Sequence, residues 1–205
     1  MCIGRFSFVL CGAALVAPAL GQDAYSDFGP GNSFSNNAGW DVSNVYTPAF
    51  QFQSTMTGAL TGFEVAMGDL GFLGVLPFTL KLYTDPGGAA GTSEGLLLGS
   101  WSGATDGTFF GDLVSPISVA ASGVTLTAGS YYWLEASGTH VEWDFNSIGA
   151  NNPMLENGSL YNIGFLYDAA YSVQLTPAAT PEPFTVGLGI AGVALAIRRR
   201  ITARA

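Results

Sequence analysis

The residues with the most evident chemistry are three neighbouring carboxylates, Glu135, Glu142 and Asp144. Glu142 and Asp144 lie two residues apart in a stretch that alternates like a β-strand, so their side chains share a face, about 7 Å apart. Two carboxyl groups separated by about 5–10 Å are what glycoside hydrolysis requires. Hydrolysis also needs one acid to be desolvated, which no residue pattern indicates here. We therefore interpret the three as solvated carboxylates on an outer strand face.

The same three carboxylates, together with Asp23, Asp27 and Asp85, offer the oxygen ligands that Ca²⁺ prefers. The sequence contains neither an EF-hand loop nor an Asp-rich nonapeptide repeat, so it assigns no ligand set. We expect no cofactor and no metal site, and calcium remains an open alternative.

A candidate nucleophile, Ser93, lies in the stretch Gly91-Thr-Ser-Glu-Gly95, which matches the G-x-S-x-G pattern of the nucleophile elbow. That elbow requires a strand before the serine, a helix after it, and an acid and a histidine downstream. Ser93 instead precedes another predicted strand, and the only histidine, His140, falls on a predicted hairpin turn. We interpret the stretch as a loop and expect the protein not to be an enzyme.

Aromatic side chains are the other candidate binding groups, because a ring pairs an apolar face, on which a sugar can stack, with polar edges. The chain has 4 tryptophans and 8 tyrosines, most of which alternate along predicted strands as core residues do. The candidate glycan contacts are Trp101, Tyr132 and Trp143. Two or three coplanar exposed rings on one sheet face would favour glycan binding over a core role.

The elements that must position these side chains are short alternating stretches between turn residues. The clearest is 78–83, in which Phe78, Leu80 and Leu82 are predicted to point inward. The glycine- and asparagine-rich stretch 29–39 is predicted to be a loop. The other predicted strands are 45–53, 59–67, 96–101, 108–114, 117–120, 124–127, 131–136, 141–145, 160–167 and 171–175. Their spacing and the absence of a convincing helix favour an all-β fold, a jelly-roll-like antiparallel β-sandwich over residues 22–176.

Charge is divided unevenly along the 205 residues. The formal net charge is −9, but residues 22–180 carry 14 carboxylates and a single base, Lys81, which gives this body a charge of −13. Such a body repels phosphate backbones, which excludes ordinary nucleic-acid binding. Both cysteines, Cys2 and Cys11, precede the body, so it has no disulfide, thiolate metal site or cysteine nucleophile.

The first 21 residues have the three parts of a secretory signal peptide. Arg5 supplies the positive charge, an apolar run covers 6–16, and the small residues of 17–21 offer cleavage sites. The run is shorter than the roughly 20 residues that a transmembrane helix needs. We therefore predict that residues 1–21 form a signal helix that directs export.

At the other end, a linker at 177–183 leads into an uncharged apolar run at 184–197 and a basic tail at 198–205. Fourteen helical residues rise about 21 Å, against a hydrocarbon core of roughly 30 Å, so this is a short transmembrane helix. The basic cluster of Arg198, Arg199 and Arg200 is expected to stay in the cytoplasm and to leave the acidic body outside.

The motif Pro181-Glu182-Pro183, the apolar run and the arginine cluster resemble, in that order, the PEP-CTERM sorting signal of Gram-negative bacteria. This resemblance implies an exported protein that its tail holds at the inner membrane. It also implies an exosortase as partner, which processes the chain near the motif before the protein reaches the cell surface or extracellular matrix. Such proteins are typically encoded by bacteria that make extracellular polysaccharide, which is therefore a second candidate partner.

The body, over residues 25–175, resembles the choice-of-anchor R domain of surface proteins. The stretches that carry this resemblance are 49–52, 82–87 and 127–134, followed by Trp143. No catalytic residues come with it. The sequence thus predicts a non-enzymatic structural or matrix protein of the cell envelope or exopolysaccharide layer. The alternative is a carbohydrate-binding module for extracellular polysaccharide, and a polysaccharide hydrolase is the least favoured.

Overall fold

Antiparallel β-strands make up most of the computed structural model, which describes residues 21–71, 73–109, 111–112, 115–161 and 168–178. The strands, in chain order, are β1 (Gln22–Ser26), β2 (Phe34–Val42), β3 (Pro48–Gln53), β4 (Gly58–Val65), β5 (Met67–Asp69), β6 (Pro77–Thr84), β7 (Leu97–Ala104), β8 (Ile117–Ala120), β9 (Thr125–Leu126), β10 (Tyr131–Gly138), β11 (Val141–Asn146), β12 (Met154–Glu156), β13 (Ser159–Leu160) and β14 (Tyr171–Pro177). A short 3₁₀ turn, η1 (Gly88–Ala90), lies between β6 and β7.

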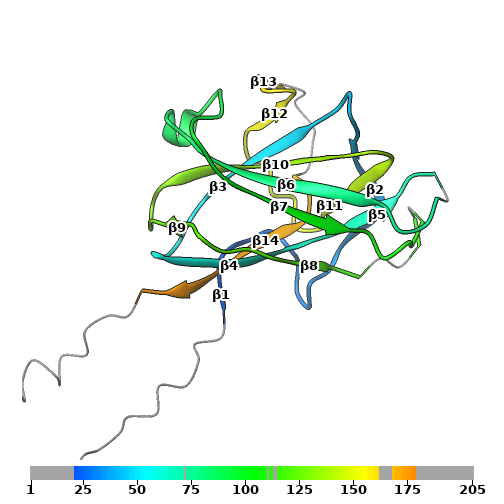
Figure 1. The fold of residues 1–205 in the computed structure, drawn as a ribbon, viewed down its shortest axis with the longest axis horizontal. Helices are drawn as coiled ribbons and strands as arrows, with labels where there is room; N and C mark the ends of the chain where they lie inside the picture. The colour runs from blue at the N-terminus through cyan, green and yellow to red at the C-terminus, as the bar shows by residue number, and fades with distance from the viewer. Residues whose placement is uncertain (1–20, 72, 110, 113–114, 162–167, 179–205) are drawn as a thin grey trace, which may run out of the picture.

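The strands form two stacked layers and a smaller third sheet (Figure 1). One layer has the order β13-β12-β3-β10-β6-β7, and the other has the order β1-β14-β4-β8, with β9 also pairing with β4. The third sheet, β2-β11-β5, lies at one side of the sandwich. Every ladder between these strands is antiparallel. The predicted all-β, antiparallel, sandwich-like fold is therefore confirmed.

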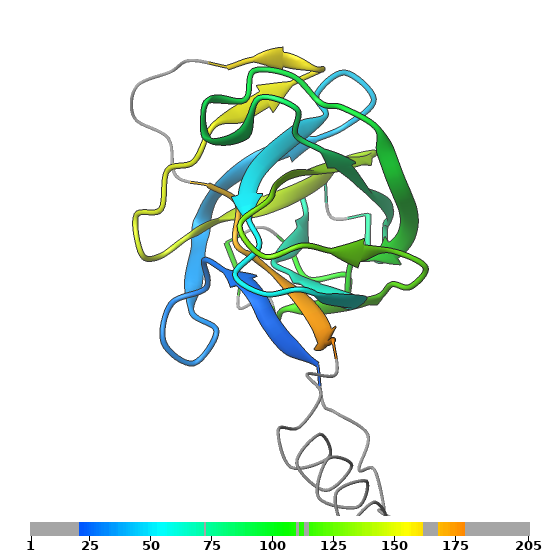
Figure 2. The same ribbon diagram turned by 90° about the vertical axis from the view of Figure 1, so that its left-hand side faces the viewer.

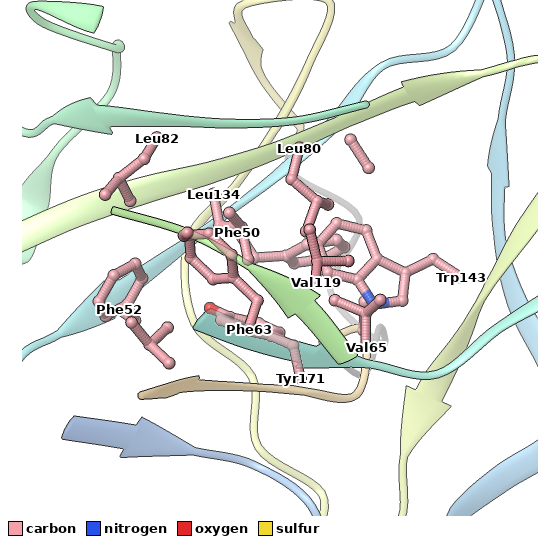
Figure 3. Close-up of a cluster of buried hydrophobic side chains, with 14 of the residues drawn as sticks. Phe50, Phe52, Phe63, Val65, Leu80, Leu82, Val119, Leu134, Trp143 and Tyr171 are labelled. Carbon is pink, nitrogen blue, oxygen red and sulfur yellow. The ribbon is translucent and has the colours of Figure 1, made fainter. Parts of the chain in front are cut away.

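Alternation along the strands places one set of apolar side chains between the layers, where they form a single main core (Figure 3). Those labelled in the figure are Phe50, Phe52, Leu80, Leu82 and Leu134 from the six-stranded sheet, Phe63, Val65, Val119 and Tyr171 from the facing sheet, and Trp143 from β11. The inward alternation predicted for 78–83 is confirmed, because Phe78, Leu80 and Leu82 are all buried.

Trp143 joins the three sheets. Its side chain is 0% exposed, and its ring lies 5.3 Å from that of Phe50 on β3 and 5.6 Å from that of Tyr171 on β14. Its indole N–H donates a hydrogen bond of 3.1 Å to the carbonyl oxygen of Ala170. The third sheet is thus held to both layers through one aromatic side chain.

One predicted loop and one predicted strand are wrong. Residues 29–39 were expected to form a loop, yet β2 begins at Phe34 and pairs with β11. β2 is the outer strand of its sheet, so one side of its backbone faces away from the ladder, and its polar residues Asn36 and Asn37 are tolerated there.

The predicted strand at 108–114 is also wrong, because the described residues of that stretch make only an isolated bridge between Phe109 and Asp69. Gly107 and Gly111 have φ angles of 84° and 90°, which break the extended conformation. Of the predicted strand at 160–167, all but the first two residues lie outside the described ranges.

The two ends of the body lie side by side. β1 and β14 are antiparallel neighbours, with Gln22 opposite Leu175, so the start of β1 and the end of β14 share one end of the body. We name it the terminal end. The hairpin of β12 and β13 lies on the opposite side of the molecule (Figures 1 and 2). We name that hairpin, together with the adjoining loop 43–47, the distal end.

If Trp143 joins the sheets as described, Trp143→Phe should lower the free energy of unfolding by about 2–4 kcal/mol, because it removes buried ring atoms and the donor to Ala170. Urea unfolding followed by circular dichroism measures the change. The matched variant is Trp101→Phe, at a partly exposed indole, which should cost clearly less. Equal effects of the two substitutions would contradict this role for Trp143.

Candidate functional site

The three side chains proposed as glycan contacts pack against the core. Trp143 is 0% exposed and Tyr132 is 6% exposed. The Tyr132 ring stacks on Phe52, and its hydroxyl accepts a hydrogen bond of 2.9 Å from the Thr127 N–H. Burial leaves neither ring a face on which a sugar could stack, so this interpretation is corrected for both. Trp101 is partly exposed, with its ring 5.3 Å from that of Phe63.

A different set of aromatic residues gathers at the distal end, around a groove of about 260 Å³. We name it the distal groove, and its lining residues are Trp40, Asp41, Tyr46, Pro48, Met154, Glu156 and Tyr161. They come from the end of β2, the loop that leads into β3, the first residue of β3, and the hairpin of β12 and β13 with the residue after it. A neighbouring hollow of about 470 Å³ shares Asp41 and Tyr46 with the groove.

Tyr46 is held in place by the turn that contains it. The Ser43 hydroxyl accepts hydrogen bonds from the backbone N–H groups of Val45 (3.3 Å) and Tyr46 (3.2 Å), and the Ser43 N–H donates to the Tyr46 carbonyl at 2.9 Å. A serine that closes a turn on its own backbone is a familiar local motif. Tyr46 is 46% exposed, so this turn presents its aromatic ring to solvent.

The hairpin of β12 and β13 fixes the same loop from the other side. Asn157 and Gly158 both have positive φ, 53° and 72°, as the two central residues of a type I′ turn do. The Asn157 side-chain oxygen accepts hydrogen bonds from the Thr47 N–H and hydroxyl, both at 3.0 Å, and its amide donates to the Val45 carbonyl at 2.7 Å. One side chain therefore ties the hairpin to the loop that carries Tyr46.

The groove joins the core through Trp40. The Trp40 ring lies 5.7 Å from that of Tyr161, nearly perpendicular to it at 81°, and 5.9 Å from that of the buried Phe50. Asp41 is exposed and Glu156 is half-buried, and both line the groove. No lysine, arginine or histidine is among the lining residues. In the described part of the chain Lys81 is the single lysine or arginine, and it bonds Glu135 at 2.7 Å.

The two carboxylates on β11 are buried, which corrects their interpretation as solvated groups. Asp144 is 0% exposed and Glu142 is 3% exposed, on the face of β11 opposite Trp143. Gly39 makes room for Glu142, since a Cβ at that position would lie 2.5 Å from the nearer Glu142 carboxylate oxygen. Within the described ranges, neither Asp144 oxygen has a hydrogen-bond partner, and one Glu142 oxygen has none.

Burial raises the pKa of both carboxyl groups, because a buried carboxylate without hydrogen-bond partners is less stable than its protonated form. Desolvation, with smaller contributions from the charges of Asp144 and Asp41, raises the pKa of Glu142 to about 8. Desolvation raises the pKa of Asp144 to about 7. A polymer cannot reach buried groups, so this pair does not form the accessible acid and base of a glycosidase. Glu135, also buried, is engaged by Lys81.

A second buried acidic group ties the β1–β14 pair, at the end of its ladder away from Gln22 and Leu175, to the loop before β12. Asp27 accepts a hydrogen bond of 2.7 Å from the Tyr171 N–H, and Asp168 accepts one of 2.8 Å from the Asn152 N–H. The Asn152 amide also donates to the Tyr25 hydroxyl, at 2.8 Å. Burial raises the pKa of Asp27 to about 8 and that of Asp168 to about 6. These contacts join β1, β14 and the loop, which is a structural role.

The candidate calcium ligands lie on separate elements: Asp23 on β1, Asp27 just after β1, Asp85 just after β6, and the others on β10 and β11. One Asp85 oxygen accepts the Gly87 N–H at 2.8 Å, which closes a turn. In the ranges that the structure describes, no three or more His, Cys, Asp or Glu side chains converge as a metal site would require. The structure thus adds no support for the calcium alternative.

The nucleophile and the histidine are separated. Ser93 lies in the loop that follows Thr84, whereas His140 lies just beyond Gly138, which pairs with Phe78 at the other end of β6. The intervening ladder is about 20 Å long. The structure therefore does not bring Ser93 and His140 together as nucleophile and base.

The sorting residues Pro181, Glu182 and Pro183 and the cluster Arg198, Arg199 and Arg200 lie outside the described residues, as does the predicted span at 184–197. Across the described ranges, no helix has the length and apolar character needed to cross a membrane. No model of a known protein family matches the chain, and no curated protein matches it. The structure by itself defines a sandwich-like all-β domain with an acidic, aromatic groove at its distal end.

The buried carboxyls predict that the protein loses stability as pH rises. Glu142 and Asp144 have folded-state pKa values above the ordinary values near 4, so the folded state binds more protons between pH 4 and pH 8. The free energy of unfolding should be highest near pH 4 and should fall toward pH 8, by roughly 3 kcal/mol for each carboxyl. Urea unfolding at pH 5 and pH 8 measures the difference.

Asp144→Asn and Glu142→Gln should each flatten this pH dependence, since each removes one group that titrates. Asp112→Asn, at an exposed carboxylate, is the matched control and should leave the slope unchanged. A slope that neither β11 variant alters would show that these carboxyls do not hold their protons at neutral pH.

Proposed function

We propose that this protein is an exported, surface-sorted and non-enzymatic structural component of the cell envelope or extracellular matrix. In this proposal a jelly-roll-like body is flanked by a signal helix and a transmembrane helix, and a PEP-CTERM tail holds the chain at the inner membrane. An exosortase processes the chain near Pro181, Glu182 and Pro183. The arginine cluster retains the tail on the cytoplasmic side.

One structural observation supports this arrangement most directly: the two ends of the body are antiparallel neighbours, with Gln22 opposite Leu175. A signal peptide before Gln22 and a membrane tail after Pro177 would both leave the body at its terminal end. A body anchored there would turn its distal end away from the membrane. That geometry suits a domain that is displayed on a surface.

Two further observations favour a non-enzymatic role. The carboxylates that could act as acid and base are buried at 0% and 3% exposure, and Ser93 and His140 lie at opposite ends of a ladder. The body, with its −13 charge, would also avoid anionic surfaces. The choice-of-anchor R resemblance fits a displayed domain that carries no catalytic residues.

This proposal predicts that deletion of residues 184–205 releases the protein from the membrane, because the deletion removes the proposed span and the basic cluster. Membrane and soluble fractions of cells that export the chain, analysed by immunoblot, measure the change. The deletion protein should first show the β-rich circular dichroism spectrum of the full chain. A deletion protein that stays in the membrane fraction would refute the anchor.

The matched control keeps the span and changes only the motif: Pro181→Ala, Glu182→Ala and Pro183→Ala in one chain. It should stay in the membrane fraction at its unprocessed mass, because the sorting enzyme no longer recognises it. Processing of this variant at the normal rate would contradict the assignment of the motif.

A further inference from the structure

We propose that the distal groove binds a protonated amino sugar in a polysaccharide chain. This goes beyond the proposed function and does not rest on it, since the groove is built entirely from the body. The groove is lined by three aromatic residues, Trp40, Tyr46 and Tyr161, and by the acidic residues Glu156 and Asp41, the latter where the groove meets the neighbouring hollow.

The aromatic residues suit a pyranose ring. Tyr46 is 46% exposed at the rim, and Trp40 and Tyr161, both half-buried, meet at 81° beside it. A sugar ring has an apolar face of C–H groups that packs against an aromatic ring, while its hydroxyls stay in water. The volume of about 260 Å³ is below the roughly 300–1,000 Å³ of pockets that enclose drug-sized ligands, so it suits one ring of a longer chain.

The carboxylates select the charge of the ligand. Asp41 and Glu156 both line the groove, and no basic residue lines it. The one lysine of the body is engaged by Glu135. An ammonium group would be attracted by the carboxylates and by the faces of the rings, whereas uronate, sulfate or phosphate groups would be repelled. A protonated amino sugar offers both the apolar face and the ammonium.

The loop and the hairpin that line the groove are tied together by hydrogen bonds. The loop that carries Tyr46 is closed by Ser43 and tied to the hairpin by Asn157 through four hydrogen bonds of 2.7–3.2 Å, one of them from its backbone N–H. A site fixed in this way loses little conformational entropy on binding. The neighbouring hollow shares Asp41 and Tyr46 and is also lined by His140; it would accept the next sugar along the chain.

The experiment is isothermal titration of the full chain, in mild detergent, with glucosamine oligomers of four to six residues that carry free amines. Fully N-acetylated oligomers of the same length and oligogalacturonate are the matched ligands. We expect the free-amine oligomer to bind at least tenfold more tightly than the acetylated one, with affinity that falls as salt rises. Oligogalacturonate should not bind. Equal affinity for the acetylated oligomer, or no binding of the free-amine oligomer at millimolar concentration, would overturn the proposal.

Three variants locate the site. Tyr46→Ala removes the exposed ring and Asp41→Asn removes a charge, and each should weaken binding at least tenfold. Asn157→Gly permits the positive φ of the hairpin turn but removes its side-chain ties to the loop, so it should weaken binding while the fold is kept. Tyr131→Ala and Asp112→Asn, away from the groove, are the matched controls.

The binding of these variants tests whether the distal groove is the binding site. Near-ultraviolet circular dichroism establishes that every variant is folded, so a loss of binding in Tyr46→Ala and Asp41→Asn alone supports the site. Unchanged binding in both would overturn it. A lysine-rich peptide that binds more tightly than the glucosamine oligomer would also overturn it, in favour of a peptide groove. Since the titration does not depend on sorting, its failure leaves the anchor proposal untouched, and the reverse also holds.

Discussion

The structure depends on burying both faces of β11. On one face, Trp143 fills the space where the three sheets meet and donates its N–H to the Ala170 carbonyl. On the other face, Glu142 and Asp144 are buried with oxygens that have no hydrogen-bond partner among the described residues, and Glu142 fits because Gly39 has no side chain. The apolar face supplies the packing energy that offsets the cost of enclosing two acids, and that cost is lowest when the acids are protonated.

The same constraint shapes the distal end. β2 is held by its ladder to β11, where Trp40 lies opposite Trp143 and Asp41 lies opposite Glu142. This pairing fixes the register of β2, and so fixes the positions of the aromatic residue Trp40 and the acidic residue Asp41 at the groove. The loop that follows is closed by Ser43 and Asn157, so the exposed Tyr46 belongs to the same rigid frame. The pairing of β2 with the core strand β11 therefore fixes where Trp40 and Asp41 lie at the groove.

Local alternation in the sequence predicted the strands that bury one regular face, and β8 at 117–120 matches its predicted range. It did not predict β2, because a polar outer strand is stabilised by its partner on β11 rather than by its own residue types. Nor could it show that Glu142 is buried, since that requires Gly39, about a hundred residues earlier in the chain, to lie beneath it.

The groove illustrates the same limit. Asn157-Gly158 is a strong local signal for a hairpin, but the sequence does not reveal that Asn157 bonds a loop 110 residues away. Aromatic residue type also made Tyr132 and Trp143 candidate glycan contacts, although both are core residues. Exposure of an aromatic ring depends on which layer covers it, and that is a property of the whole sandwich.

The central claim is that the body lies outside the inner membrane, anchored at its terminal end. The body contains no cysteine, so one introduced at Val45, 65% exposed at the distal end, is a unique label site once the signal peptide is removed. Intact spheroplasts expressing Val45→Cys are treated with a membrane-impermeant maleimide, with the unsubstituted chain as control. We expect labelling without lysis. Labelling that occurs only after lysis would place the body in the cytoplasm and contradict the account.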